Sequence, residues 1–154
     1  MRTLGTLLAV AILLAGCSRA PESRVTLVEA RIDGITCPTC VPPLRNALKR
    51  RYEGSTVDVD EAKNTATVHF TSSDKFSAPE FRAAVERVRM KVITFRMEAC
   101  GTVESTDAGK RMTIGGDRFA VRSEGDVPVK TPICADGTLD TRTDPATFEI
   151  TTVR

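Results

Sequence analysis

The feature that most constrains the fold of this chain is the order of its apolar patterns between Val25 and Glu98. Apolar side chains alternate with polar ones in four short segments, which is typical of half-buried strands, and recur every three or four positions in two others, which is typical of helices. The order is strand, helix, strand, strand, helix, strand. Two right-handed β-α-β crossovers around a hairpin give a four-stranded antiparallel sheet with both helices on one face. The sequence therefore predicts an α+β, ferredoxin-like domain over residues 25–98.

Start and stop signals support these segments. Pro42-Pro43 opens the first expected helix, and the capping box Ser77-Ala78-Pro79-Glu80 opens the second. The positions expected to face the core are Val28, Ala30 and Ile32 in the first strand, Leu44, Ala47, Leu48 and Tyr52 in the first helix, Val57, Val59, Ala66, Val68 and Phe70 in the hairpin, Phe81, Ala84, Val85 and Val88 in the second helix, and Ile93, Phe95 and Met97 in the last strand.

Residues 99–154 have a different character, because short alternating runs are separated by turn residues and no helical stripe is present. The stretch Ile114-Gly115-Gly116-Asp117 is a candidate for a tight hairpin turn. Four or five short strands in this segment predict a small all-β domain, a barrel that resembles an OB-fold. The division between the two domains is expected at Glu98.

The amino-terminal segment reads as a signal peptide. Arg2 gives a positive start. The apolar run from Leu4 to Ala15 that follows is too short to span a bilayer comfortably and ends in small residues. The sequence Leu14-Ala15-Gly16-Cys17 resembles the bacterial lipoprotein box, which implies cleavage after residue 16 and lipidation of Cys17. An ordinary signal peptide that contains a cysteine is the alternative. Residues 17–24 then form a tether, and the protein is expected in the cell envelope, at the outer membrane facing the periplasm if the host is Gram-negative.

Composition excludes several classes of function. The net charge of +2 argues against a nucleic-acid partner, because proteins that bind nucleic acids carry a strongly basic face. The single histidine, His69, excludes sites that need two imidazoles, and the strand pattern places it on the open face of the sheet. Because no nucleophile–base pair is recognisable either, we expect a protein that is not an enzyme.

The remaining chemistry lies in the cysteines, first in Cys37 and Cys40. Two thiols three positions apart, where a loop enters a helix, can converge on one ion, and the helix start favours the thiolate. Two soft sulfurs suit Cu(I) or Hg(II), whereas Zn(II) prefers four ligands. A structural disulfide and a thioredoxin-like redox pair are the alternatives, since an envelope compartment is oxidising.

The sequence Gly34-Ile35-Thr36-Cys37-Pro38-Thr39-Cys40-Val41, followed by Leu44 and Ala47-Leu48, resembles the metal-binding loop of the heavy-metal-associated domain family. That family includes copper chaperones and periplasmic mercury scavengers. The resemblance implies metal binding by Cys37 and Cys40. It departs from the family at Ile35, where Met is usual, and at Arg89-Met90-Lys91, where an aromatic residue or Lys usually lies near the metal. Met90 is a candidate to shield the ion, with a plain core position as the alternative.

Cys100 and Cys134 are a candidate disulfide in the carboxy-terminal segment. Closing a loop of this size stabilises a protein by about 4 kcal/mol in the chain-entropy relation. A second metal site, or a relay to Cys37 and Cys40, is the alternative. The relay is weakened by distance, because Cys100 lies about 30 Å from the loop at strand rise.

Together these residues predict an envelope lipoprotein that captures or transfers a soft metal ion, Cu(I) or Hg(II), and exchanges it with a donor or acceptor protein. Its membrane contact is the lipid anchor. The basic cluster of Arg45 and Lys49-Arg50-Arg51 reads as a solvated helix face, with docking to an acidic partner or lipid as the alternative. The competing functions are thiol–disulfide exchange by the same cysteines and a protein-interaction module without metal.

Overall fold

A computed structural model describes residues 21–71 and 73–154 of the chain. The elements are β1 (Arg24–Asp33), the 3-10 helix η1 (Pro38–Cys40), α1 (Val41–Arg51), β2 (Thr56–Asp60), β3 (Thr65–His69), α2 (Ala78–Glu86), β4 (Lys91–Thr106), β5 (Gly109–Ile114), β6 (Asp117–Ser123), β7 (Pro132–Asp140) and β8 (Thr147–Val153).

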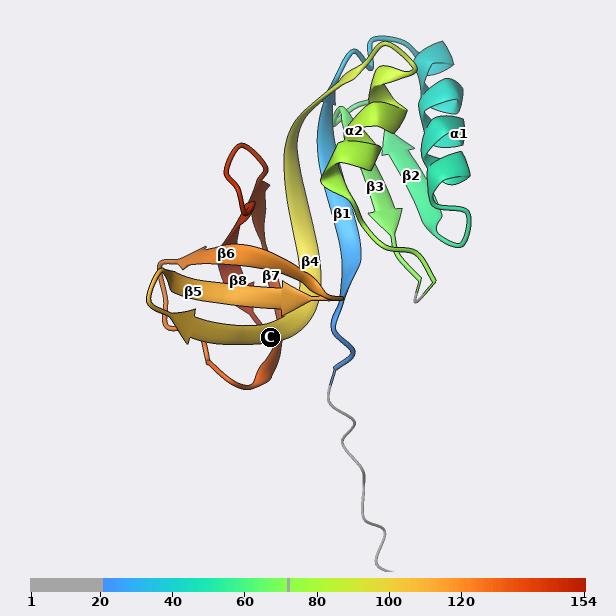
Figure 1. Ribbon diagram of the computed structural model, residues 1–154. Helices are drawn as coiled ribbons and strands as arrows, with labels where there is room; N and C mark the ends of the chain where they lie inside the picture. The colour runs from blue at the N-terminus through green and yellow to red at the C-terminus, as the bar shows by residue number, and fades with distance from the viewer. Residues whose placement is uncertain (1–20, 72) are drawn as a thin grey trace, which may run out of the picture.

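All eight strands belong to one mixed sheet in the order β2-β3-β1-β4-β5-β6-β8-β7. Every neighbouring pair is antiparallel except β6 and β8, which run parallel. An additional pairing joins β4 to β7, so that β4, β5, β6, β8 and β7 close into a five-strand ring. Figure 1 shows β4 bending away from β1 into this ring, with α1 and α2 lying together beside β1, β2 and β3.

The expected fold class is therefore wrong. A ferredoxin-like four-stranded sheet followed by a separate small all-β, OB-like domain is not formed, because the strand after α2 continues from Lys91 to Thr106 without a break. The physical reason is visible in the alternation, which carries on through Met97, Ala99 and Val103, all of them buried. No turn residue interrupts the strand at Glu98, so the expected division falls within β4.

The local elements of the amino-terminal part agree with the sequence pattern. Helix α1 buries Leu44, Ala47 and Leu48, and β2 and β3 form the expected hairpin. Helix α2 begins at Ala78 after Ser77, although the hydroxyl of Ser77 makes no capping hydrogen bond.

The pattern misplaces one residue of the last strand. Ile93 was expected in the core and is 49% exposed, whereas Val92 is buried. The register between β1 and β4 shifts between Arg31 and Ile32, which pair with Thr94 and Val92. This irregularity exchanges the two faces of β4 at that point, since successive strand residues point to opposite sides.

A tight turn and a strand bend shape the ring. The expected tight turn joins β5 to β6, and both of its central residues, Gly115 and Gly116, have positive φ, as hairpin turns of the primed type require. In β4, Gly101 lies where the strand leaves β1, and a Cβ there would collide with the carbonyl oxygen of Thr113 on β5. The absence of a side chain at Gly101 therefore lets β5 approach the bend closely.

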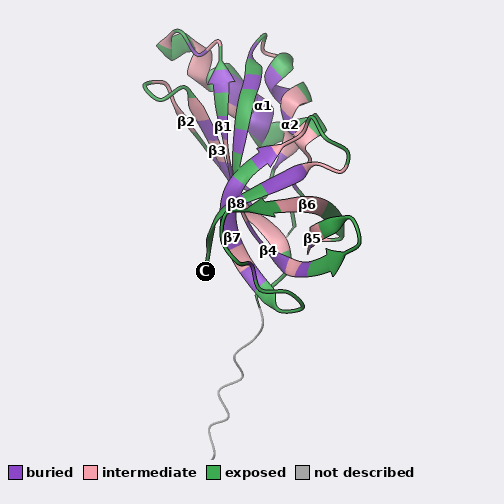
Figure 2. Cartoon of the chain, turned by 90° about the vertical axis from the view of Figure 1, so that its left-hand side faces the viewer, coloured by how far each residue is buried: buried purple, intermediate pink, exposed green. Residues whose placement is uncertain are grey.

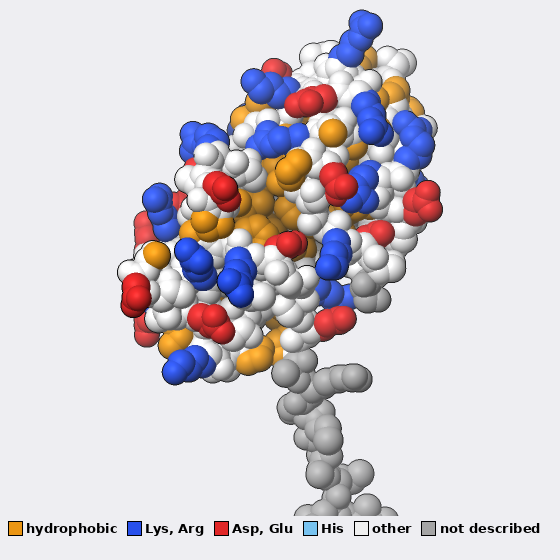
Figure 3. Space-filling model, viewed as in Figure 1, with side chains coloured by type: hydrophobic (Ala, Val, Ile, Leu, Met, Phe, Trp, Pro, Cys, Tyr) orange, Lys and Arg blue, Asp and Glu red, His pale blue; other side chains and the backbone are white. Residues whose placement is uncertain are grey.

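A single hydrophobic core runs through both parts of the molecule. Phe95, Met97 and Ala99 of β4 connect the residues beneath the helices with those inside the ring. In Figure 2 buried and exposed residues alternate along the strands of the sheet. Figure 3 shows hydrophobic side chains gathered in a hollow between the helices and the ring, with charged side chains around it.

Candidate functional site

The candidate site is the loop that joins β1 to α1. Gly34 follows β1 with a φ of 105°, a conformation that other residues rarely adopt. Ile35 is buried and anchors the loop in the core. Cys37 has an extended backbone and precedes η1, whose last residue, Cys40, is the N-cap of α1. The loop thus presents both cysteines around a single turn of helix.

Cys37 and Cys40 are joined by a disulfide, with their Cα atoms 5.4 Å apart. The backbone N–H of Cys40 donates to the carbonyl oxygen of Cys37 at 2.9 Å, which holds the turn. Both residues are half-buried, so the pair is accessible from solvent. The hydroxyl of Thr39 lies 3.2 Å from Sγ of Cys37 and is the donor, because a disulfide sulfur carries no proton.

Met90 lies beside the start of this loop. Its side chain is buried, and its Cγ lies 3.2 Å from the place that a Cβ on Gly34 would take. Met90 therefore packs on the Gly34 backbone as part of the hydrophobic core. Its expected role in shielding an ion stays a prediction.

No further metal ligands gather at the loop. Within residues 21–71 and 73–154, no group of three or more His, Cys, Asp and Glu side chains is placed to hold a metal ion. His69 is exposed on β3, where it pairs with Leu27 near the start of β1 rather than with the end that leads to Cys37. What the site offers is therefore two sulfurs alone, which suits two-coordinate binding of a soft ion or reversible disulfide formation.

Cys100 and Cys134 lie directly opposite each other on β4 and β7 and form a second disulfide. This bridge closes the seam of the five-strand ring. Cys100 also pairs with Arg24 at the beginning of β1, whereas the candidate loop follows the end of β1 at Asp33. A ten-residue strand spans about 30 Å. The two cysteine pairs are thus at opposite ends of β1 and share no site.

The far end of α1 is held by Tyr52, whose side chain is fully buried. Its hydroxyl donates to the carbonyl oxygen of Ser77 at 3.4 Å, and burial raises the pKa of Tyr52 to about 12. Beside it, Arg51 forms an ion pair with Glu80 of α2. These contacts fix α1, and so the helix start that carries Cys40, against α2. The sequence pattern indicated Tyr52 but not the ion pair.

The lipidation residue, Cys17, lies outside the described residues. In the part of the chain that the structure covers, no helix is both long and apolar enough to cross a bilayer.

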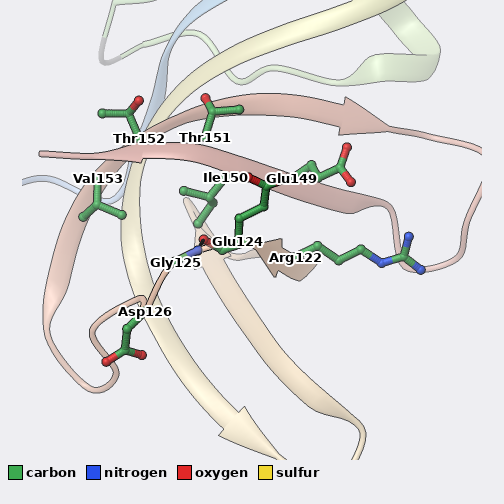
Figure 4. Close-up of a pocket in the computed structure, with 10 residues that line it drawn as sticks. Arg122, Glu124, Gly125, Asp126, Glu149, Ile150, Thr151, Thr152 and Val153 are labelled. Carbon is green, nitrogen blue, oxygen red and sulfur yellow. Dashed lines mark hydrogen bonds between the residues drawn. The ribbon is translucent and has the colours of Figure 1, made fainter.

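The sequence pattern also gave no sign of a cavity of about 650 Å³ at the carboxy-terminal end of β8 (Figure 4). Its walls come from a loop and from a strand end, and neither carries a recognisable motif. Thr39 was missed for another reason, because its contact with Cys37 depends on the turn that η1 makes.

Comparison with known proteins gives no relative. No protein-family model matches the chain, and no curated protein or solved structure matches it either. The likeness of the Cys37–Cys40 loop to the heavy-metal-associated family thus stays a resemblance carried by the loop residues.

Proposed function

We propose that this protein binds one soft metal ion, Cu(I) or Hg(II), between the thiolates of Cys37 and Cys40, and exchanges it with a partner protein. The role is binding and transfer rather than catalysis. The observation that supports it most is the placement of two half-buried cysteines around one helical turn with no imidazole or carboxylate completing a larger ligand set among the described residues.

The chemistry of the pair fits such an ion. Thiolates are the soft ligands that Cu(I) and Hg(II) prefer, and a site with two ligands leaves room for an incoming thiolate before the old bond breaks. The helix start at Cys40 favours negative charge, and the hydroxyl of Thr39 is in reach of a thiolate at Cys37. The disulfide form binds no ion, so metal uptake requires prior reduction of the pair by an external dithiol, which gives up two electrons and two protons and becomes a disulfide itself.

The position of the loop supports transfer to a soluble partner. The described chain begins near Arg24, at the end of β1 beside the ring, and the loop lies beyond the opposite end of β1 (Figure 1). If Cys17 carries the lipid anchor, the anchor is joined to the start of β1, and the candidate loop lies at the opposite end of a strand about 30 Å long. Loss of the protein from membrane fractions in Cys17→Ala tests this anchor.

The proposed binding is tested by titrating the reduced protein with Cu(I), and separately with Hg(II), against a competing chelator. We expect one ion per chain, lost in Cys37→Ser and in Cys40→Ser. The matched control is Cys100→Ser/Cys134→Ser, which removes the other pair and keeps the binding. Stoichiometric binding that survives Cys37→Ser would contradict the proposal.

A second candidate function, thiol–disulfide exchange, is favoured by the disulfide between Cys37 and Cys40. In that reaction one thiolate of the reduced pair attacks a substrate disulfide and expels one substrate thiolate. The other cysteine then attacks the mixed disulfide and releases the second thiolate, so that two electrons pass to the substrate. The reduction potential of the Cys37–Cys40 pair, measured by equilibration with glutathione, distinguishes the two functions. A potential of about −120 to −270 mV, the range of known exchange proteins, together with no tight metal binding, would support thiol–disulfide exchange.

A further inference from the structure

Strand β8 extends three residues beyond its parallel neighbour. β6 and β8 pair from Ala120 and Thr147 to Ser123 and Ile150. There β6 ends, while β8 continues to Val153. Within the described residues, no strand pairs with 151–153 on the β6 side. This stretch is an open strand edge inside an otherwise closed ring.

The backbone of Val153 faces the open side. The N–H of Arg154 donates to the carbonyl oxygen of Cys134 on β7 at 2.8 Å. In an antiparallel ladder, residues that exchange hydrogen bonds with the partner alternate with residues whose N–H and C=O point away from it. Because Val153 precedes Arg154 and pairs with Ala135, its N–H and C=O point away from β7. They are a donor and an acceptor for an added strand.

A cavity of about 650 Å³ adjoins this edge. One wall is the strand end from Glu149 to Val153, and the other is the segment Arg122–Asp126 after β6. Figure 4 shows Ile150 and Val153 on the side of β8 that faces this segment, whereas Thr151 and Thr152 project the other way. Ile150 is buried and Val153 is 36% exposed. The cavity therefore offers an apolar surface directly beneath the open edge.

The charges around the cavity are mainly acidic. Glu124, Asp126 and Glu149 line it with one basic residue, Arg122. Asp126 is paired with Lys110 at 3.3 Å, and Arg122 lies opposite Glu149 in the β6–β8 ladder, but no described cation lies within ion-pair distance of Glu124. A cationic side chain placed beside Glu124 would be favoured.

We propose that this cavity binds an extended peptide segment of a partner protein, which adds to β8 as a strand and places a Lys or Arg side chain beside Glu124. Backbone hydrogen bonds to a free edge supply affinity in this mode of recognition, and pockets for alternate side chains supply specificity. The other edge strand, β2, is a poorer acceptor, because Asp58 and Asp60 alternate along it and charged residues protect strand edges.

The probe is the blocked peptide Ac-Val-Lys-Val-Lys-Val-Thr-NH2, with a second peptide in which Glu replaces Lys. In a titration followed by NMR, the Lys peptide should change the chemical shift of the Val153 amide and leave the chemical shifts of the β2 amides unchanged. Glu124→Gln should bring the affinities for the Lys and Glu peptides closer together.

The decisive variant is Val153→Pro, which removes the N–H that faces the cavity. An edge residue whose N–H faces outward tolerates proline, so the fold should persist. We expect peptide binding to weaken about tenfold, the factor expected for one lost hydrogen bond. The matched control, Val153→Ala, keeps the N–H and should bind within about twofold of the wild type, as surface changes usually do.

A peptide N-methylated at its central valine tests the reciprocal contact, because it loses a peptide N–H that would donate to a β8 carbonyl oxygen, and it should also bind weakly. The proposal is overturned if the Val153 amide does not move at millimolar Lys peptide. It is equally overturned if Val153→Pro or the N-methylated peptide binds as well as the originals, or if the Glu peptide binds as tightly as the Lys peptide.

Discussion

Replacing Cys100 and Cys134 together by alanine tests how much the second disulfide stabilises the five-strand ring. The bridge joins residues 34 positions apart in sequence. The chain-entropy relation then gives a loss of about 4 kcal/mol in the free energy of unfolding, because the unfolded chain regains the freedom that the closed loop removes. With a urea m-value of about 2 kcal/mol/M, the unfolding midpoint should fall by about 2 M.

The measurement is urea unfolding followed by far-UV circular dichroism, without reductant. The m-value should rise in the variant, since an unfolded chain without the bridge is more expanded and exposes more surface. The matched control is Cys37→Ala/Cys40→Ala, in which the sequence separation is 3. The same relation assigns this loop less than about half of the effect. Equal losses in the two variants would refute the argument, because the stabilisation would not follow loop length.

Three further predictions concern single positions. Gly137→Ala should lower the free energy of unfolding by about 1–3 kcal/mol in the same urea assay, because a Cβ at position 137 collides with the backbone of β8. The control is Gly125→Ala, where the new Cβ meets open space, and it should change the free energy of unfolding by under about 0.5 kcal/mol. Burial raises the pKa of Tyr52 to about 12 in the folded protein, so the contribution of the neutral phenol to the free energy of unfolding is retained below pH 10 and lost between pH 10 and 12. Because the chain has one tyrosine, tyrosinate absorbance measured against pH reports this group alone. Ionisation of Tyr52 at pH 10 without a loss of stability would contradict burial as the cause of the shift. Arg89 has a φ of 62°, so Arg89→Gly should raise the melting temperature, while Arg87→Gly, at a φ of −57°, should lower it; a fall in both would show that the left-handed conformation at position 89 costs little.

The sequence predicted the elements well and their assembly poorly. Helical stripes, the β2–β3 hairpin and the Gly115-Gly116 turn are local patterns, and each is decided by residues within a few positions. The path of β4 is not local. Nothing in the pattern of residues 91–106 says which strands will lie beside them, and β4 pairs with β1, β5 and β7 along different parts of its length. The ring that overturns the predicted fold class depends on these distant pairings.

The candidate loop was predictable in part. The spacing of Cys37 and Cys40 and the proline-led helix after them indicated a loop at a helix start, and the structure places them there. The hydrogen bond from Thr39 depends on the backbone conformation of η1, so the residue pattern alone does not predict it. The open edge of β8 was beyond prediction for a similar reason, since it arises from the difference in length between two strands that are far apart in sequence.

The continuous sheet also changes how the proposed sites relate to one another. β1 and β4 pair along the length of β1, from Arg24 to Asp33, and share one hydrophobic core with the ring. The Cys37–Cys40 loop lies beyond one end of this pair, and the second disulfide lies at the other. The β8 edge is close to that second end, because Val153 pairs with Ala135, the neighbour of Cys134. A strand pair of this length separates the two proposed sites, the β8 edge and the Cys37–Cys40 loop, by roughly 30 Å. A peptide segment that fills only the proposed β8 site therefore does not contact the Cys37–Cys40 loop, so the two proposals can be tested independently.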